Sequence, residues 1–163
     1  MFDHEMRDSA ERVLHACRKR KLRVVTAESC TGGLVAATLT AIAGSSDVVE
    51  RAFVTYANEA KREMLGVPWE ALMGYGAVSE PVARAMAAGA LARSTADLAV
   101  SVTGIAGPAG GTIDKPVGLV YLAAARRDRD AIAERHVFPG DRDAIRRVSV
   151  LTALTMLASL AEA

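Results

Sequence analysis

The sequence predicts a three-layer α/β fold with a mixed sheet of about five strands. Three observations carry this prediction. The chain is 51% hydrophobic and only 4% aromatic, so alanine, valine and leucine must build the core. Early in the chain, short β-branched runs alternate with stretches of helical periodicity. Late in the chain, two strand-like runs adjoin without a helix between them. With 163 residues and neither linker nor repeat, residues 1–163 should form one domain.

The first half of the chain alternates between the two kinds of element. Apolar residues from Met6 to Cys17 recur at helical spacing and predict an amphipathic helix. Asn58 is expected to cap a short helix that carries Lys61 and Leu65. The amphipathic helix is expected over 4–20, and before Asn58 the sequence also predicts a strand over 22–26, a helix over 34–42, a turn over 44–47 and a strand over 48–56.

Glycine and proline mark a loop region at 66–68 and 74–76 in the second half of the chain. Ser79 is expected to cap the next helix, with Pro81 tolerated in its first turn. Asp141 is expected to cap the last helix. The predicted elements are a helix over 80–95, a strand over 98–102, an irregular stretch over 103–117, strands over 118–125 and 131–138, and a helix from 141 to about 161.

Composition excludes several classes of function. The formal net charge is +1, so the chain has no overall attraction for nucleic acid or for an anionic membrane. The sequence carries no apolar leader, and no stretch is expected to span a bilayer. Cys17 and Cys30 do not make a disulfide framework, which favours a cytoplasmic protein with reduced thiols. His4, His15 and His136 lack metal-ligand spacing, so neither a metal nor another cofactor is expected.

Ser29 lies between the first predicted strand and a helix, in the segment Ala27-Glu28-Ser29-Cys30-Thr31-Gly32-Gly33. Ligands of open α/β sheets bind at this carboxyl edge, and glycines let the backbone approach a ligand closely. Free N–H groups at the helix start can stabilise an anion or an oxyanion. Two interpretations stand: Ser29 is a helix cap, which the local pattern favours, or a nucleophile. The segment lacks the Gly-x-Ser-x-Gly elbow of esterases.

A serine nucleophile needs a base, and no histidine lies in a segment typical of a site. Lys61 and Tyr56 are the candidates, because the second strand and the short helix bring them toward the same edge. A lysine desolvated in a pocket has a lowered pKa and can accept the serine proton. The alternative for Lys61 is an ordinary surface position. Cys30 is a rival nucleophile, although a small residue packed under the turn is the simpler role for it.

A second glycine-rich segment runs from Thr103 to Thr112, directly after a predicted strand. Exposed amides and threonine hydroxyls suit a phosphate or a ribose, but the segment is not a Walker loop. A structural turn is the alternative, and we favour the ligand loop.

Arg142 and Arg146 lie four residues apart at the start of the last helix, where cations are disfavoured. A bound phosphate would offset that repulsion. Asp141 and Asp143 could equally neutralise the two arginines, so both explanations stand.

Seven short segments together resemble the CinA C-terminal domain family. They occur in order over residues 5–160. They are Ala27-Glu28-Ser29-Cys30-Thr31-Gly32-Gly33, Gly44-Ser45-Ser46, Phe53-Val54-Thr55-Tyr56-Ala57-Asn58-Glu59-Ala60-Lys61, Gly76-Ala77-Val78-Ser79, Val102-Thr103-Gly104-Ile105-Ala106-Gly107-Pro108, Lys115-Pro116-Val117-Gly118 and Phe138-Pro139-Gly140-Asp141-Arg142. Each alone is weak, but the set is highly specific.

The resemblance implies hydrolysis of the carboxamide of nicotinamide mononucleotide to nicotinate mononucleotide and ammonia. Ser29 would be the nucleophile, assisted by Lys61 and Tyr56. Arg142 and Arg146 could then hold the substrate phosphate. The residues implied to line the site are Thr31, Gly32, Gly33, Asn58, Thr103, Gly104, Gly107, Gly110, Gly111 and Thr112.

Two residues depart from the family pattern: Ala43 and Ala109 stand where the family often has proline and glycine. These departures affect loop shape and, through it, substrate affinity, and they leave the proposed chemical groups in place. Two other functions remain open at this point: a non-catalytic nucleotide-binding module, and a structural or partner-binding domain. We expect a small-molecule nucleotide as the partner and a homo-oligomer as the assembly, with neither nucleic acid nor membrane bound.

Overall fold

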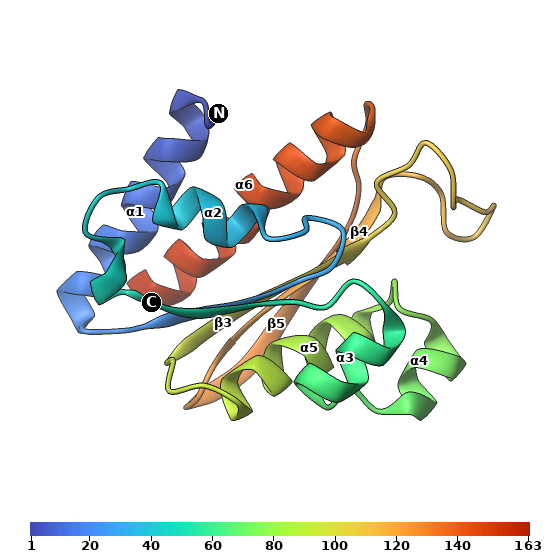
Figure 1. Cartoon of the computed structure of the whole chain (residues 1–163), viewed down its shortest axis with the longest axis horizontal. Helices are drawn as coiled ribbons and strands as arrows, with labels where there is room; N and C mark the ends of the chain where they lie inside the picture. Colours follow the sequence, from blue (N-terminus) through green and yellow to red (C-terminus); the bar gives the residue numbers. More distant parts are fainter.

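The computed structural model describes residues 1–163 and shows a five-stranded sheet between two layers of helices (Figure 1). The strands are β1 Val24–Glu28, β2 Val49–Val54, β3 Leu98–Gly104, β4 Leu119–Arg126 and β5 Arg129–Val137. Their order in the sheet is β2-β1-β3-β4-β5. The β1 strand is parallel to both β2 and β3, whereas β3, β4 and β5 pair antiparallel. The predicted α/β fold with a mixed sheet is confirmed.

Three helices cover one face of the sheet: α1 His4–Arg20, α2 Leu34–Thr40 and α6 Arg142–Glu162 (Figure 1). A core cluster of 27 buried residues lies between them and the sheet. The carboxylate of Asp3 caps α1 by accepting from the Met6 N–H. The Asp141 carboxylate caps α6 by accepting from the Ala144 N–H, as predicted.

The opposite face carries α3 Asn58–Leu65, α4 Trp69–Tyr75 and α5 Glu80–Ala92 (Figure 1). A second cluster of 15 buried residues, rich in alanine, lies beneath them. The α3 and α5 backbones approach so closely that a Cβ on Gly89 would overlap the Leu65 carbonyl. This close packing fixes α3, and with it Lys61, against the sheet.

Several local predictions were wrong. Asn58 is the first residue of α3 and not its cap, because the extended N-cap residue is Ala57. The expected loop over 66–76 contains α4, whose Leu72 is buried while glycines flank the helix. The Ser79 hydroxyl donates to the Gly76 carbonyl (2.8 Å) and makes no cap bond to α5.

The ends of several strands also differ from the predicted ends, and the difference decides where Ser29 lies. The expected strand over 22–26 runs from 24 to 28, because the Leu22 N–H donates to Cys17 at the end of α1. The β2 strand ends at Val54 and β3 continues to Gly104. Ser29 is therefore the first residue after β1.

The α6 helix qualifies the expectation that no stretch could span a bilayer. By length and composition alone, residues 142–162 are long and apolar enough to do so. Ten of its residues are nevertheless buried, and it packs against α1, β3 and β4. We therefore assign it as a core helix of this fold.

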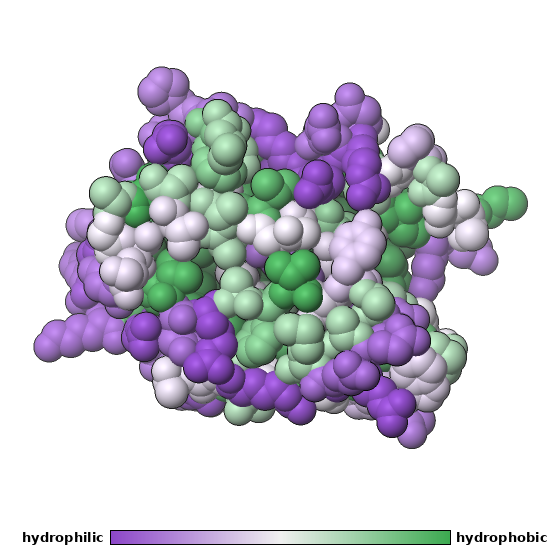
Figure 2. Space-filling model, in the orientation of Figure 1, coloured by the Kyte–Doolittle hydropathy of each residue, from purple (hydrophilic) through white to green (hydrophobic).

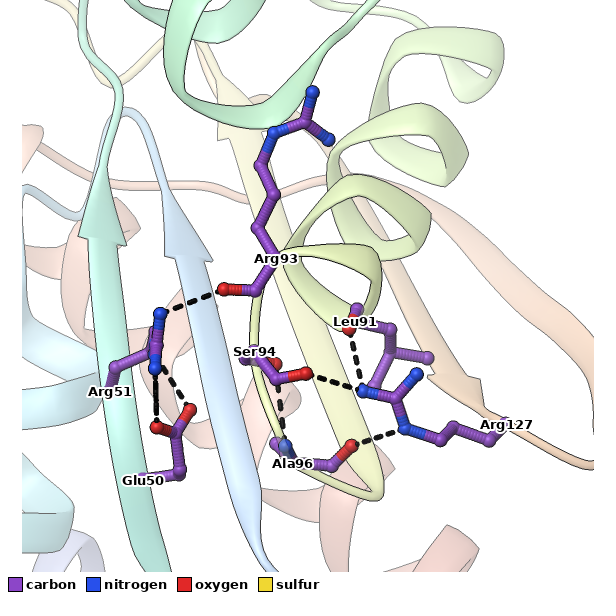
Figure 3. A network of polar contacts seen from close by, with 7 residues as sticks. All are labelled: Glu50, Arg51, Leu91, Arg93, Ser94, Ala96 and Arg127. Atoms are coloured by element: carbon purple, nitrogen blue, oxygen red, sulfur yellow. Dashed lines mark hydrogen bonds and ion pairs between the residues drawn. The ribbon is translucent and has the colours of Figure 1, made fainter.

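Two arginines bond backbone carbonyls at the end of the sheet where β1 and β3 begin, whereas Ser29 follows the other end of β1. Figure 3 shows these contacts. The Arg51 guanidinium donates to the Arg93 carbonyl (2.8 Å) and pairs with Glu50. The Arg127 guanidinium donates to the carbonyls of Leu91, Ser94 and Ala96, at the end of α5 and in the loop before β3. These bonds tie α5 to the sheet.

Candidate active site

Ser29 begins the turn that joins β1 to α2. Its N–H donates to the Val102 carbonyl of β3 (2.9 Å), and its carbonyl accepts from the Gly32 N–H (3.0 Å). Gly32 (φ 57°) and Gly33 (φ 99°) take left-handed backbone conformations that other residues adopt at a cost. Gly33 is the N-cap of α2, so the interpretation of Ser29 as the helix cap is excluded. The Ser29 residue is 8% exposed.

Lys61 reaches Ser29 from α3 and is 1% exposed. Its Nζ lies 3.0 Å from Ser29 Oγ, 2.8 Å from the Thr55 carbonyl and 3.1 Å from the Tyr56 carbonyl. No salt bridge includes this lysine. Burial lowers its pKa from 10.5 to about 8. The alternative of a surface lysine is excluded.

The three partners of Lys61 assign a direction to each hydrogen bond once the amine is neutral. A neutral amine has two N–H donors and one lone pair. The Thr55 and Tyr56 carbonyls can only accept, so they take the two hydrogens. The lone pair then faces Ser29 Oγ, the one partner that can donate a proton. The pair is arranged for proton transfer from Ser29 to Lys61.

Cys30 is next to Ser29 but has the opposite character. It is a free, buried cysteine, and burial raises the pKa of its thiol to about 11. A protonated thiol is a poor nucleophile. Cys30 belongs to the core cluster beneath α2 and α6. This position fits the interpretation from sequence that Cys30 is a small residue packed under the turn. No group of three or more His, Cys, Asp or Glu side chains gathers as a metal-ligand set.

Glu28 is a buried carboxylate that sequence reasoning left without a role. It is 0% exposed and accepts from the Thr26 hydroxyl (3.2 Å) and the Thr31 hydroxyl (2.7 Å). It also accepts from the N–H groups of Val35 (2.8 Å) and Ala36 (3.1 Å) in the first turn of α2. The start of α2 thus binds the side chain of Glu28, and the Thr31 hydroxyl stabilises the turn by donating to the same carboxylate.

The free N–H groups of the turn lie closer to Ser29. Those of Cys30, Thr31 and Gly33 donate to no backbone carbonyl. Backbone donors next to a nucleophile can stabilise a negative oxygen in a transition state. The turn therefore offers oxyanion donors, while the first turn of α2 does not.

Tyr56 and Arg142 meet at the rim of the site. The Arg142 guanidinium donates to the Gly107 carbonyl (2.8 Å) and to the Tyr56 hydroxyl (3.2 Å). Tyr56 is 62% exposed, and it contacts Lys61 through its carbonyl. The structure thus directs the Tyr56 side chain to Arg142, while its backbone orients Lys61.

Arg146 lies one turn further along α6. It donates to the carbonyls of Cys30 (3.1 Å) and Thr31 (3.4 Å), so it braces the Ser29 turn from the α6 side. Two of its N–H groups are used on these carbonyls. Arg142 is the more exposed of the two cations expected from sequence to hold a phosphate.

The glycine-rich loop between β3 and β4 begins inside the site and ends on the surface. The Thr103 hydroxyl donates to the Ala77 carbonyl (2.8 Å). Gly104 and Gly111 have close backbone neighbours that leave no room for a side chain. The Thr112 hydroxyl accepts from the Lys115 N–H (3.0 Å), which closes a local turn. These contacts hold the loop in place, and Gly110–Thr112 are exposed to solvent.

Known proteins resemble this chain over nearly its whole length. The family model described as the CinA C-terminal domain matches residues 6–161. The chain belongs to the CinA C-terminal domain family. Among curated relatives, it is 53% identical over 157 residues to the nicotinamide-nucleotide amidohydrolase PncC of Escherichia coli (strain K12), covering 96% of this chain and 95% of that one. A CinA-like protein of Akkermansia muciniphila is 54% identical, but this chain covers only 34% of its length.

Solved structures place the fold in the same family. The competence/damage inducible protein CihA from Agrobacterium tumefaciens has a TM-score of 0.96 and 51% identity, with 98% of each chain covered. A CinA superfamily protein from Escherichia coli has a TM-score of 0.92 and 34% identity, with 98% of this chain and 93% of that one covered. The mixed five-stranded sheet is therefore the fold of CinA structures.

In this CinA-family chain, the structure brings most of the expected site residues together. Ser29, Lys61 and the Tyr56 backbone are in direct contact, and Arg142 and Arg146 bond the surrounding segments. Asn58 is half-buried, with no side-chain bond to this group. Sequence reasoning missed Glu28 and Thr55, both of which lie inside the quoted motifs. The signal that could have found them is their position at strand ends beside Ser29.

Proposed function

We propose that this chain hydrolyses the carboxamide of nicotinamide mononucleotide through an acyl-enzyme on Ser29. The observation that carries the proposal is the buried contact of 3.0 Å between Lys61 Nζ and Ser29 Oγ. It occurs in a chain that is 53% identical over nearly its full length to a nicotinamide-nucleotide amidohydrolase. The products are nicotinate mononucleotide and ammonia. We also propose a cytoplasmic location, which suits the two free, buried cysteines.

The proposed mechanism begins with neutral Lys61. Its lone pair takes the Ser29 proton while Ser29 Oγ attacks the amide carbon, and the carbonyl oxygen becomes an oxyanion. Free N–H groups of the turn stabilise this charge, and each well-placed donor contributes about 3 kcal/mol. The Lys61 ammonium then gives its proton to the leaving nitrogen. The substrate's pyridinium ring withdraws electrons, which already makes the amide carbon electrophilic.

The substrate phosphate is proposed to bind Arg142 at the rim. The first turn of α2 is unavailable, because the Glu28 carboxylate accepts its N–H groups. Arg142 is exposed and uses one donor each on Gly107 and Tyr56, so the guanidinium keeps further donors for an anion. Tyr56 holds the guanidinium in place and in this proposal transfers no proton.

Purified protein and nicotinamide mononucleotide test the proposal directly. Ammonia and nicotinate mononucleotide should appear in equal amounts, and Ser29→Ala should abolish both while circular dichroism stays unchanged. Cys30→Ala is the matched control at the neighbouring position and should retain turnover. Retained activity in Ser29→Ala would reject the nucleophile. Binding without turnover by the wild-type chain would instead support a nucleotide-binding module.

A further inference from the structure

Thr55 carries a buried hydroxyl that no group in the protein satisfies. The residue is 0% exposed, and its Oγ1 has no hydrogen-bond partner. Its backbone is fully used, since the N–H donates to the Glu28 carbonyl (2.9 Å) and the carbonyl accepts from Lys61 (2.8 Å). Buried polar groups without partners are rare and cost stability. A valine of nearly the same shape would avoid that cost.

The sheet register places Thr55 beside Ser29. Glu28 of β1 is level with Val54 of β2 and with Val102 of β3. The next residues along these parallel chains therefore form one row, Thr55–Ser29–Thr103. Adjacent strands are about 4.8 Å apart, so a hydroxyl residue flanks Ser29 on each side.

The three residues of this row also share one face. Side chains alternate along strands. Ala27 and Ala99 belong to the cluster under α3–α5, and Phe53 packs against it. Two residues beyond Ala27 and Phe53, and four beyond Ala99, the strands thus return to the same face with Ser29, Thr55 and Thr103 respectively. Lys61 of α3 lies over this row, bonded to Ser29 Oγ and to the Thr55 carbonyl.

The two flanking hydroxyls differ in what they can still do. Thr103 donates to the Ala77 carbonyl, so its hydroxyl already has a partner that holds it in place. Thr55 keeps its hydrogen and its lone pairs, and it lies on the same side of Ser29 as the lysine amine. That side is where a leaving nitrogen must be to receive a proton from Lys61. Thr55 Oγ1 has no partner in the protein, so a small group that takes part in the reaction can bond it.

We propose that Thr55 is a further catalytic residue, whose hydroxyl holds the leaving nitrogen and then the water that replaces it. This inference rests on the proposed amidase function. As the C–N bond breaks, the nitrogen takes the proton that Lys61 received from Ser29, and Thr55 accepts a hydrogen bond from the departing ammonia. Water then enters the same position.

The second half of the reaction uses the same contacts. One water hydrogen faces the Lys61 lone pair and the other faces Thr55 Oγ1, which directs the oxygen lone pair at the acyl carbon. Lys61 takes one proton as the C–O bond to water forms. The bond from the acyl carbon to Ser29 Oγ breaks, and Oγ regains its proton from Lys61. The nucleotide carboxylic acid and the free enzyme result.

Thr55→Val tests this role because it removes the hydroxyl and keeps the shape. We expect kcat to fall by roughly 10- to 100-fold, with little change in KM. The thermal midpoint should stay equal or rise, because an unsatisfied buried group has been removed. Thr55→Ser should recover most of the lost activity. Thr38→Val is the matched control: Thr38 is a buried threonine of α2 whose hydroxyl bonds the Leu34 carbonyl, and its kcat should be unchanged.

The possible outcomes separate this inference from the proposed function. A wild-type chain without amidase activity would overturn both. An active wild type with wild-type kcat in Thr55→Val would overturn the Thr55 role alone. So would a parallel loss of thermal stability and activity, which indicates a structural role. If Thr55→Val fails to fold, Thr55→Ala and Thr55→Ser are compared, and equal loss of kcat in these two rejects the hydroxyl.

Discussion

The position of Lys61 on α3 sets the protonation of its side-chain amine. Its amine is buried against two carbonyls and a serine hydroxyl, without a carboxylate partner. Burial disfavours the charged form, and the pKa falls from 10.5 to about 8. The amine is therefore neutral in a useful fraction of molecules near neutral pH. An exposed lysine would be almost entirely charged there.

This lowered pKa predicts the pH dependence of turnover. Lys61 must be neutral to act as a base, so kcat/KM should rise about tenfold per pH unit below 8 and level off above it. The free energy of unfolding should also rise with pH between 8 and 10.5, because the unfolded chain then binds the extra proton. Initial rates across pH measure the first effect. A kcat/KM that does not change between pH 6 and 9 would contradict the role of Lys61.

Lys61→Arg is the sharpest substitution at this position. Arginine keeps the positive charge and cannot lose its proton near neutral pH, so we expect turnover to fall by at least about 100-fold. Ammonia release measures turnover, and thermal unfolding reports whether the larger side chain is accommodated. Lys61→Met removes the charge at similar size and should be inactive while folded. Near-normal rates in either variant would exclude Lys61 as the base.

At the scale of elements, the turn from β1 to α2 is built around the Glu28 carboxylate. The hydroxyls of Thr26 and Thr31 donate to it, and so do two N–H groups in the first turn of α2. A carboxylate at a helix start suits the macrodipole. Because Glu28 precedes Ser29 and binds Thr31, its bonds hold both ends of the turn that carries the nucleophile.

Glu28→Gln should therefore loosen this turn. An amide replaces one acceptor oxygen with a donor, which leaves an α2 N–H or a hydroxyl unpaired and costs about 2 kcal/mol of stability. Urea unfolding measures this loss, and kcat should fall with it because Ser29 is less well held. Glu80→Gln is the control, since Glu80 forms an exposed i,i+4 pair with Arg84 and should change stability by less than about 0.5 kcal/mol. Equal stability of the two variants would contradict the role of Glu28.

At the scale of the whole molecule, apolar side chains remain on the surface. Figure 2 shows a band of apolar residues across the middle of the face seen in Figure 1, with hydrophilic residues around it. Exposed large apolar residues include Tyr56 at the rim of the site, Tyr75, Ile113, and Ile132 and Val137 on the edge strand β5. Exposed apolar patches and edge strands are typical of surfaces that associate.

We therefore predict that the chain forms a homo-oligomer in solution. Light scattering coupled to size exclusion should give a mass that is a multiple of 17.1 kDa. The mass should persist at high salt, because apolar contacts are not screened as ion pairs are. A mass of one chain at micromolar concentration would contradict the prediction.

The order of the main strands and helices could be read from sequence because periodicity is local. The apolar spacing of α1 and the β-branched run of each strand can each be recognised within a short stretch of sequence. The wrong predictions also came from local patterns. The glycines around α4 indicated a loop, and Asn58 was predicted as the cap of α3, whereas the cap is the residue before it, Ala57. Tertiary packing of Leu72 under α5 decided the first case.

The sequence by itself determined the α/β alternation, the Ser29 turn after a buried strand and the ordered motifs that mark the CinA family. Tertiary structure alone decided which groups meet. Ser29 and Lys61 are 32 residues apart, and their contact depends on the close packing of α3 on α5 and on the sheet register. The same packing buries Lys61 and leaves the Thr55 hydroxyl without a partner. Burial and long-range contacts set a pKa and a hydrogen-bond partner, and no local pattern in the chain encodes either.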